Sequence, residues 1–211
     1  MREDKGIRGL HIALLIALAG LGAWSAFTPR DRLTWFLEAA PVIIGIPILA
    51  FTYRSFRLTD LAYTLIFAHS IILLIGGHYT YAEVPLFNWI RDALSLSRNH
   101  FDRVGHFAQG FIPAIIAREV LIRRSPVEKG GWLFLFVTSI SLSISAFYEL
   151  IEWWAAVTSK EATVAFLGSQ GDIWDTQWDM FMALIGALAS QISLASLHDR
   201  ALDKLREAGL F

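Results

Sequence analysis

Apolar residues gather along the chain in blocks of about twenty, the length that crosses the hydrocarbon core of a bilayer as a helix. Short polar stretches separate the blocks. The pattern predicts six membrane-spanning helices, at residues 9–27, 33–53, 58–76, 100–121, 131–157 and 177–197. We therefore expect an all-α protein, a polytopic membrane helix bundle in one integral membrane domain over residues 1–211.

Two segments between or after the spans have different patterns. Residues 78–99 mix aromatic and polar side chains, are too polar to span, and contain Pro85, so we expect them to lie along the membrane interface. Residues 198–211 alternate charged and apolar side chains, as a short amphipathic helix does. The pair Gly76-Gly77 is a natural helix stop and sets the end of the third span.

Composition supports the membrane interpretation. The chain is 55% hydrophobic and 18% charged, whereas a soluble domain is about 45–50% apolar and about 25% charged. The net charge of −1 gives no reason to expect a nucleic-acid partner. The absence of Cys excludes disulfides, a haem-attachment motif and thiolate metal sites.

Lys and Arg in the short loops orient the bundle, because these residues are more frequent in cytoplasmic loops. With the N-terminus inside, the inner segments hold eleven Lys and Arg and the outer segments six. The six outer residues are Arg30, Arg32, Arg91, Arg98, Arg103 and Lys160. We therefore expect both termini in the cytoplasm.

With this orientation, acids and histidines collect near the outer ends of the spans. The acids are Glu38, Asp102, Glu149, Glu152, Asp172, Asp175 and Asp179. A charge at the bilayer centre costs about 2.5–3.5 kcal/mol on insertion scales, so we expect these side chains to face one another rather than lipid. Three arginines in this layer, Arg91, Arg98 and Arg103, are too few to neutralise seven acids. The excess negative charge predicts a bound cation or protonated carboxyl groups.

Local spacings make this layer a candidate metal site, because side chains three, four or seven residues apart share one face of a helix. The predicted ligands come from three stretches: Asp102 and His106; Glu149 and Glu152; and, if that stretch is helical, Asp172, Asp175 and Asp179. His and carboxylate ligands without Cys suit a divalent ion such as Zn, Mn, Mg, Ca or Fe.

Neighbouring residues receive other roles. The residues predicted to bind substrate are Arg98, Asn99, His100 and Arg103, since a guanidinium group matches phosphate in a fork. His78 or Glu38 is predicted to act as a catalytic base. His69, in the middle of the third span, is expected to hydrogen-bond a neighbouring helix, and His198 is expected to be structural.

A structural interpretation competes with the metal site. Glu149 and Glu152 could pair with Arg98 or Arg103 and form an ion-pair network in a dry interior. The tryptophans beside the acids are expected to form the outer aromatic belt of the membrane rather than a substrate platform. These tryptophans are Trp153, Trp154, Trp174 and Trp178.

Four motifs together resemble the bacterial inner-membrane family typified by YjdF: residues His78–Tyr81, Arg98–Phe107, Tyr148–Trp153 and Gly171–Met180. The resemblance covers nearly the whole chain and implies a multi-pass protein of the bacterial inner (plasma) membrane; it implies no activity. A shorter stretch is similar to VanZ-like membrane proteins, through Asp175, Asp179 and Gly186. There a Glu-x-x-Gln is expected where this chain has Glu149-x-x-Glu152.

Three function classes are compatible with these residues. The first is a metal-dependent hydrolase or transferase that acts at the outer interface on an amphiphile, such as a lipid phosphate or a polyprenyl-linked molecule. The second is an ion- or proton-coupled transporter, which requires a water path through cytoplasmic half-spans that are nearly uninterrupted apolar runs. The third is a non-catalytic binding or resistance protein of the cell envelope. The residues carry no signal for the oligomeric state.

Overall fold

The computed structural model describes residues 2–158 and 169–210, with side chains from residue 9 onward, and every regular element in these ranges is helical. The α-helices are α1 (Arg2–Ala26), α2 (Arg32–Thr52), α3 (Asp60–Tyr79), α4 (Pro85–Ala93), α5 (Phe101–Arg124), α6 (Gly131–Thr158) and α8 (Asp175–Glu207). A short 3-10 turn, η1 (Tyr81–Glu83), precedes α4. The predicted all-α bundle is confirmed.

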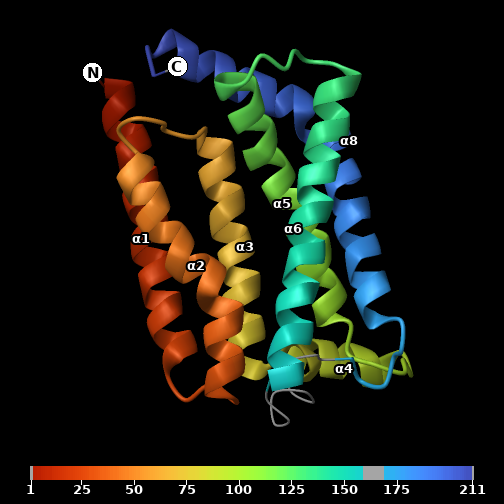
Figure 1. The fold of residues 1–211 in the computed structure, drawn as a ribbon. Helices are drawn as coiled ribbons and strands as arrows, with labels where there is room; N and C mark the ends of the chain where they lie inside the picture. The colour runs from red at the N-terminus through yellow and green to blue at the C-terminus, as the bar shows by residue number, and fades with distance from the viewer. Residues whose placement is uncertain (1, 159–168, 211) are drawn as a thin grey trace.

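The long helices form two groups that meet at α3 and α5 (Figure 1). Helix α3 packs on α1 and α2, and α5 packs on α6 and α8. Five described helices are long and apolar enough to cross a membrane: α1, α2, α3, α6 and α8. Helix α5 is more polar, but its 24 residues are long enough to span as well, at about 1.5 Å per residue. It can carry polar side chains because α3, α6 and α8 shield it from lipid.

Two glycines allow α5 and α8 to approach closely. A side chain at Gly110 of α5 would collide with the backbone of Ala183, and one at Gly186 of α8 would collide with the backbone of Phe107. Small residues at membrane helix interfaces let backbones pack in this way. The close approach brings the polar residues of the two helices together at both ends of the bundle.

The predicted end of the third span is wrong. Helix α3 continues through Gly76 and Gly77 to Tyr79. The ring of Tyr81 lies where a side chain of Gly76 would stand, and Gly77 faces Trp35 and Glu38 of α2. These glycines make room for neighbouring side chains, so they do not end the helix.

The tail predicted to be an amphipathic helix is helical, but it is the continuation of α8, which runs without a break from Asp175 to Glu207. Its last turns lie across the end of the bundle (Figure 1). Their apolar side chains Leu202 and Leu205 are buried. The amphipathic pattern therefore reflects packing of one long helix on the bundle.

Both termini lie at the same end of the bundle, as an even number of spans requires (Figure 1). The connections between α2 and α3 and between α5 and α6 lie at that end too. It is the end with the larger share of Lys and Arg, so the distribution of these residues predicts that it faces the cytoplasm. Lys160, counted on the outer side, lies outside the described residues.

Candidate metal centre

Acids and one histidine from three helices converge near the outer end of the bundle. Two groups of three side chains each have ligand atoms within 4.8 Å of one another. The first group is Asp102, His106 and Asp179, and the second is His106, Glu149 and Glu152. All five side chains are buried, and His106 belongs to both groups.

Helical spacing places these side chains as the sequence suggests. Asp102 and His106 stand one turn apart on the inward face of α5. Glu149 and Glu152 continue the buried face of α6, whose other positions recur every four residues and include Ser141 and Ser145. The inward faces of α5 and α6 thus each present two potential ligands at the same level of the bundle.

His106 stands between two carboxyl groups. Its Nε2 lies 3.6 Å from Asp102 Oδ1 and 3.6 Å from Glu149 Oε1. These separations are long for hydrogen bonds. They match ligand atoms around a shared ion, since two ligands bound at about 2.0–2.2 Å stand roughly 3–4 Å apart.

Several buried polar atoms of this centre have no hydrogen-bond partner among the described residues: Glu149 Oε1, Asp179 Oδ1 and His106 Nδ1. Among the described residues, no Lys or Arg lies within salt-bridge distance of Glu149, Glu152 or Asp179. A buried carboxylate without a partner is costly. The residues present therefore fit a bound cation.

The arginines of the layer are occupied by other acids. Arg98 pairs with Asp175 and lies 3.5 Å from both Asp102 and Asp172. Arg103 Nη2 donates to Asp172 Oδ2 at 2.8 Å. The alternative in which arginines neutralise Glu149 and Glu152 is therefore wrong.

The predicted stripe of three acids on one helix is only partly present. Helix α8 begins at Asp175, and Asp172 lies before it, where its Oδ1 accepts from the backbone N–H of Trp174 at 3.0 Å. Asp172 and Asp175 face the arginines. Of this stretch, only Asp179 belongs to a group of potential ligands, the one with Asp102 and His106.

Glu38 borders a small cavity of about 20 Å³ beside the centre, together with Asp102, His106 and Glu152. The Tyr148 hydroxyl donates to Glu38 Oε2 at 3.0 Å. The predicted catalytic residue Glu38 therefore lies next to the potential ion ligands, held by a tyrosine.

The other predicted site residues lie in different surroundings. His78, the second predicted catalytic residue, has its Nδ1 3.0 Å from the carbonyl of Ser25 and stacks on Trp24 of α1. Its contacts are thus with α1, away from the acids.

Asn99 and His100, predicted to bind substrate, both precede α5. The Asn99 side chain donates to Val84 O and Asn88 Oδ1, at 3.1 and 2.9 Å, and fixes the entry of α5 against the start of α4. His100 is partly exposed at the cap position of α5 and caps no backbone N–H. With Arg98 and Arg103 paired to acids, these residues form no open anion site.

Sequence reasoning missed three residues around the cavity: His69, Gln109 and Tyr148. His69 was expected to hydrogen-bond a neighbouring helix, but its Nε2 has no partner in the described chain. Gln109 could have been found, since it follows His106 by three residues and so shares its face of α5. Tyr148 likewise precedes Glu152 by four residues and so shares its face of α6, but its partner Glu38 lies on α2, which spacing does not show.

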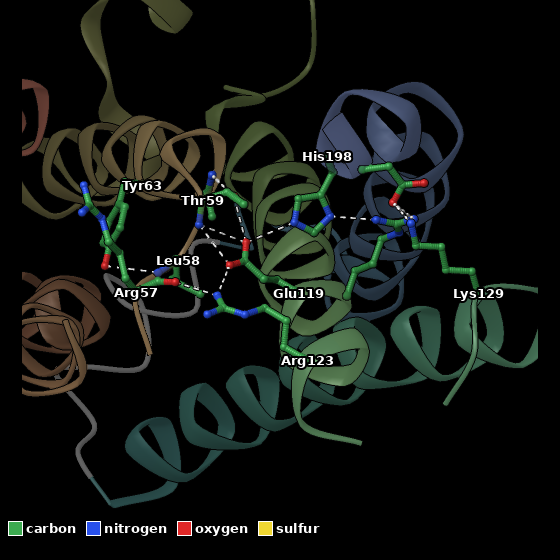
Figure 2. Close-up of polar contacts among 11 residues, drawn as sticks. Arg57, Leu58, Thr59, Tyr63, Glu119, Arg123, Lys129 and His198 are labelled. Carbon is green, nitrogen blue, oxygen red and sulfur yellow. Dashed lines mark hydrogen bonds and ion pairs between the residues drawn. The ribbon is translucent and has the colours of Figure 1, made fainter. Parts of the chain in front are cut away.

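A second buried charge cluster, at the cytoplasmic end, shows how this chain satisfies a structural carboxylate (Figure 2). Glu119 is fully buried. Its Oε1 accepts from Thr59 N at 3.0 Å and Arg123 Nη1 at 2.7 Å. Its Oε2 accepts from Thr59 Oγ1 at 2.8 Å and lies 3.1 Å from His198 Nε2.

The histidine of this inner cluster has both ring nitrogens engaged. Arg118 Nη1 lies 2.8 Å from His198 Nδ1, and an arginine only donates, so Nδ1 accepts and Nε2–H donates to Glu119. Asp199 in turn accepts from Arg118 and Lys129, at 2.8 and 2.9 Å. Every acid here has a basic partner, which agrees with the expected structural role of His198. The outer centre differs because Glu149, Glu152 and Asp179 have no such partner among the described residues.

Comparison with known proteins gives a consistent result. The family model DUF2238, described as a predicted membrane protein, matches residues 10–200. Inner membrane protein YjdF of Escherichia coli (strain K12) is 48% identical to the chain over 201 residues, which cover 95% of this chain and 92% of that protein. No solved structure matches.

Proposed function

The chain belongs to the DUF2238 family of predicted membrane proteins, and we propose that it binds one divalent metal ion near the outer side of the inner membrane. The proposed ligands are Asp102, His106, Glu149, Glu152 and Asp179. One observation carries the proposal. His106 lies between two sets of buried carboxyl groups, and three of these acids, Glu149, Glu152 and Asp179, have no Lys or Arg partner in the described chain. Glu149 and Asp179 each also have an oxygen without a hydrogen-bond partner there.

The chemistry of the ligands suits this role. One imidazole and several carboxylates, without Cys, match Zn, Mn or Fe, and the high share of oxygen also suits Mg or Ca. Nε2 of His106 lies 3.6 Å from one member of each group, Asp102 and Glu149, and it can donate one lone pair to one ion. We therefore expect one ion per chain rather than two.

The ion is proposed to serve hydrolysis or group transfer on an amphiphile of the outer leaflet, such as a lipid phosphate or a polyprenyl-linked molecule. When bound, a divalent ion polarises a phosphoryl oxygen and lowers the pKa of water. Glu38, held by Tyr148 beside the ligands, is the proposed base. Because Arg98 and Arg103 are paired, the anionic head group would bind mainly through the ion.

Position in the bundle favours an amphiphilic substrate. The centre lies near the level of exposed tryptophans at the outer ends of α6 and α8, including Trp153, Trp154 and Trp174. Tryptophans gather at the head-group level of membranes. The cavity of about 20 Å³ is too small for a head group, so substrate entry would require the helices to part at the outer end.

Transport is less well supported than catalysis. An apolar cluster of Ala114, Leu133, Val137 and Ala187 lies along α5, α6 and α8 between the outer acids and the inner Glu119 network. This cluster and the satisfied inner network oppose a water path to the cytoplasm.

Phosphate release from lipid probes tests the catalytic part of the proposal. Protein reconstituted in liposomes with phosphatidic acid or a polyprenyl diphosphate is expected to release inorganic phosphate when Zn²⁺ or Mn²⁺ is added, and to stop when a chelator is added. Glu38→Gln should lower the rate without removing the ion. An ion that binds to the wild type without phosphate release from either probe would contradict catalysis and favour a binding protein.

A further inference from the structure

Three residues that line the cavity beside the metal centre each have a buried polar atom without a hydrogen-bond partner in the ranges the structure describes. These atoms are His69 Nε2 of α3, and His106 Nδ1 and Gln109 Oε1 of α5. The cavity volume of about 20 Å³ exceeds the roughly 10–15 Å³ that one water molecule needs. Three unsatisfied polar atoms and room for one water together describe a polar site next to the proposed ion ligands, of which Asp102, His106 and Glu152 also line the cavity.

The two ring nitrogens of His106 face different surroundings. Nε2 faces the carboxyl groups of Asp102 and Glu149, at 3.6 Å from each. Nδ1 is the atom without a protein partner, and Gln109 and His69 line the cavity together with His106. The ring therefore has a proposed ion side at Nε2, and its Nδ1 is left without a protein partner in the described chain.

The position of one proton decides whether His106 can bind an ion. A neutral imidazole carries a single proton, on Nδ1 or on Nε2, and only the bare nitrogen is a ligand. The nearby carboxyl groups favour a proton on Nε2, which would block the ion side. A proton on Nδ1 requires an acceptor in or around the cavity, and Gln109 Oε1 is an acceptor only.

We propose that Gln109, assisted by His69, is a positioning residue that keeps the proton of His106 on Nδ1 and so leaves Nε2 free for the ion. Gln109 accepts this proton directly or through one buried water, and His69 Nε2 completes the hydrogen bonds of that water. Partners of this kind commonly orient metal-binding histidines and fix their tautomer. The purpose of the arrangement rests on the proposed ion site, but the tautomer itself is a property of the metal-free protein.

The tautomer can be measured by NMR of metal-free protein labelled with ¹⁵N in its six histidines. Two histidines serve as internal references. His78 should carry its proton on Nδ1, because the Ser25 carbonyl near that atom only accepts. His198 should carry its proton on Nε2, which faces Glu119 (Figure 2).

We expect the Nδ1–H form for His106 in the wild type. Gln109→Leu, which is similar in size and has no acceptor, should shift His106 towards Nε2–H. Gln109→Glu retains an acceptor oxygen and should preserve Nδ1–H. The Nε2–H form in the wild type, or the same tautomer in wild type and Gln109→Leu, would overturn the proposal. Unchanged signals of His78 and His198 show that each variant is folded.

Ion affinity supplies a second readout. Gln109→Leu should weaken Zn²⁺ binding by about 10–100-fold, the usual effect of losing a partner of a metal-bound histidine, whereas Gln109→Glu should not. Equal affinity in wild type and Gln109→Leu would contradict the positioning role. If the wild type shows a Gln109-dependent Nδ1–H signal and yet binds no ion, the positioning role stands and the proposed function fails.

Discussion

Replacing His106 by leucine is expected to lower the affinity for Zn²⁺ or Mn²⁺ by more than about 100-fold. The expectation follows from the geometry, because His106 is the member that both groups of ligands share. Mutating a residue that merely orients a metal ligand lowers metal affinity about 10–100-fold, so loss of a shared ligand should lower the affinity further. Calorimetric titration of metal-free protein measures the change.

His78→Gln is the matched control for this variant. His78 contacts Ser25 and Trp24 of α1, so its replacement should leave ion affinity within the error of the titration. Equal losses in the two variants would place the ion elsewhere or reveal a general loss of fold. Retention of full affinity in His106→Leu would exclude the site.

Glu119→Gln and Asp179→Asn are expected to change the stability of metal-free protein in opposite directions. Glu119 accepts from Thr59, Arg123 and His198, and its neutral replacement breaks a satisfied network, at a cost of about 3–5 kcal/mol. Asp179 has no basic partner in the described chain. Its neutral replacement should remove repulsion and stabilise by about 1 kcal/mol or more.

Thermal unfolding in detergent, with chelator and then with saturating Zn²⁺, tests both expectations. A ligand at one hundred times its Kd stabilises by about 2.7 kcal/mol. Zn²⁺ should raise the melting temperature of wild type and of Glu119→Gln. It should raise the melting temperature of Asp179→Asn much less. If Asp179→Asn unfolds in chelator at a temperature as much below wild type as Glu119→Gln does, the protein itself satisfies the Asp179 carboxylate, which would contradict the expectation.

Much of the fold was predictable because it depends on local patterns. The apolar blocks predicted α2, α3 and α6 within about three residues, whereas α1 begins seven residues before its predicted span and α8 ends ten residues after it. The even number of predicted spans also placed both termini at one end of the bundle (Figure 1). Helical spacing alone placed Asp102 with His106, and Glu149 with Glu152, on inward faces.

Features that depend on contacts between distant segments were not predictable in this way. The pairing of Asp172 and Asp175 with Arg98 and Arg103 arises where the connection before α8 meets the start of α5. A sequence pattern shows an excess of acids but not which of them the arginines neutralise. The Gly76-Gly77 pair was wrongly predicted to end the helix for the same reason. These glycines make room for Tyr81 and for residues of α2, which are distant in the sequence or lie on another element.

The surroundings of His106 Nδ1 illustrate a different limit. Gln109 lies on a predictable face of α5, yet its importance depends on His69 of α3 and on a cavity that only the packed bundle defines. Polar residues inside membrane helices are individually ambiguous, because a hydrogen bond to any neighbour can satisfy them. Their roles become clear when the unsatisfied atoms are located.

The central claim is that the outer acids hold a divalent ion, and elemental analysis of the native protein tests it most directly. Protein purified from membranes without chelator should contain close to one equivalent of a divalent metal per chain, and Asp179→Asn purified in parallel should contain far less. Metal-free native protein that also fails to take up Zn²⁺, Mn²⁺, Mg²⁺, Ca²⁺ or Fe²⁺ would contradict the claim.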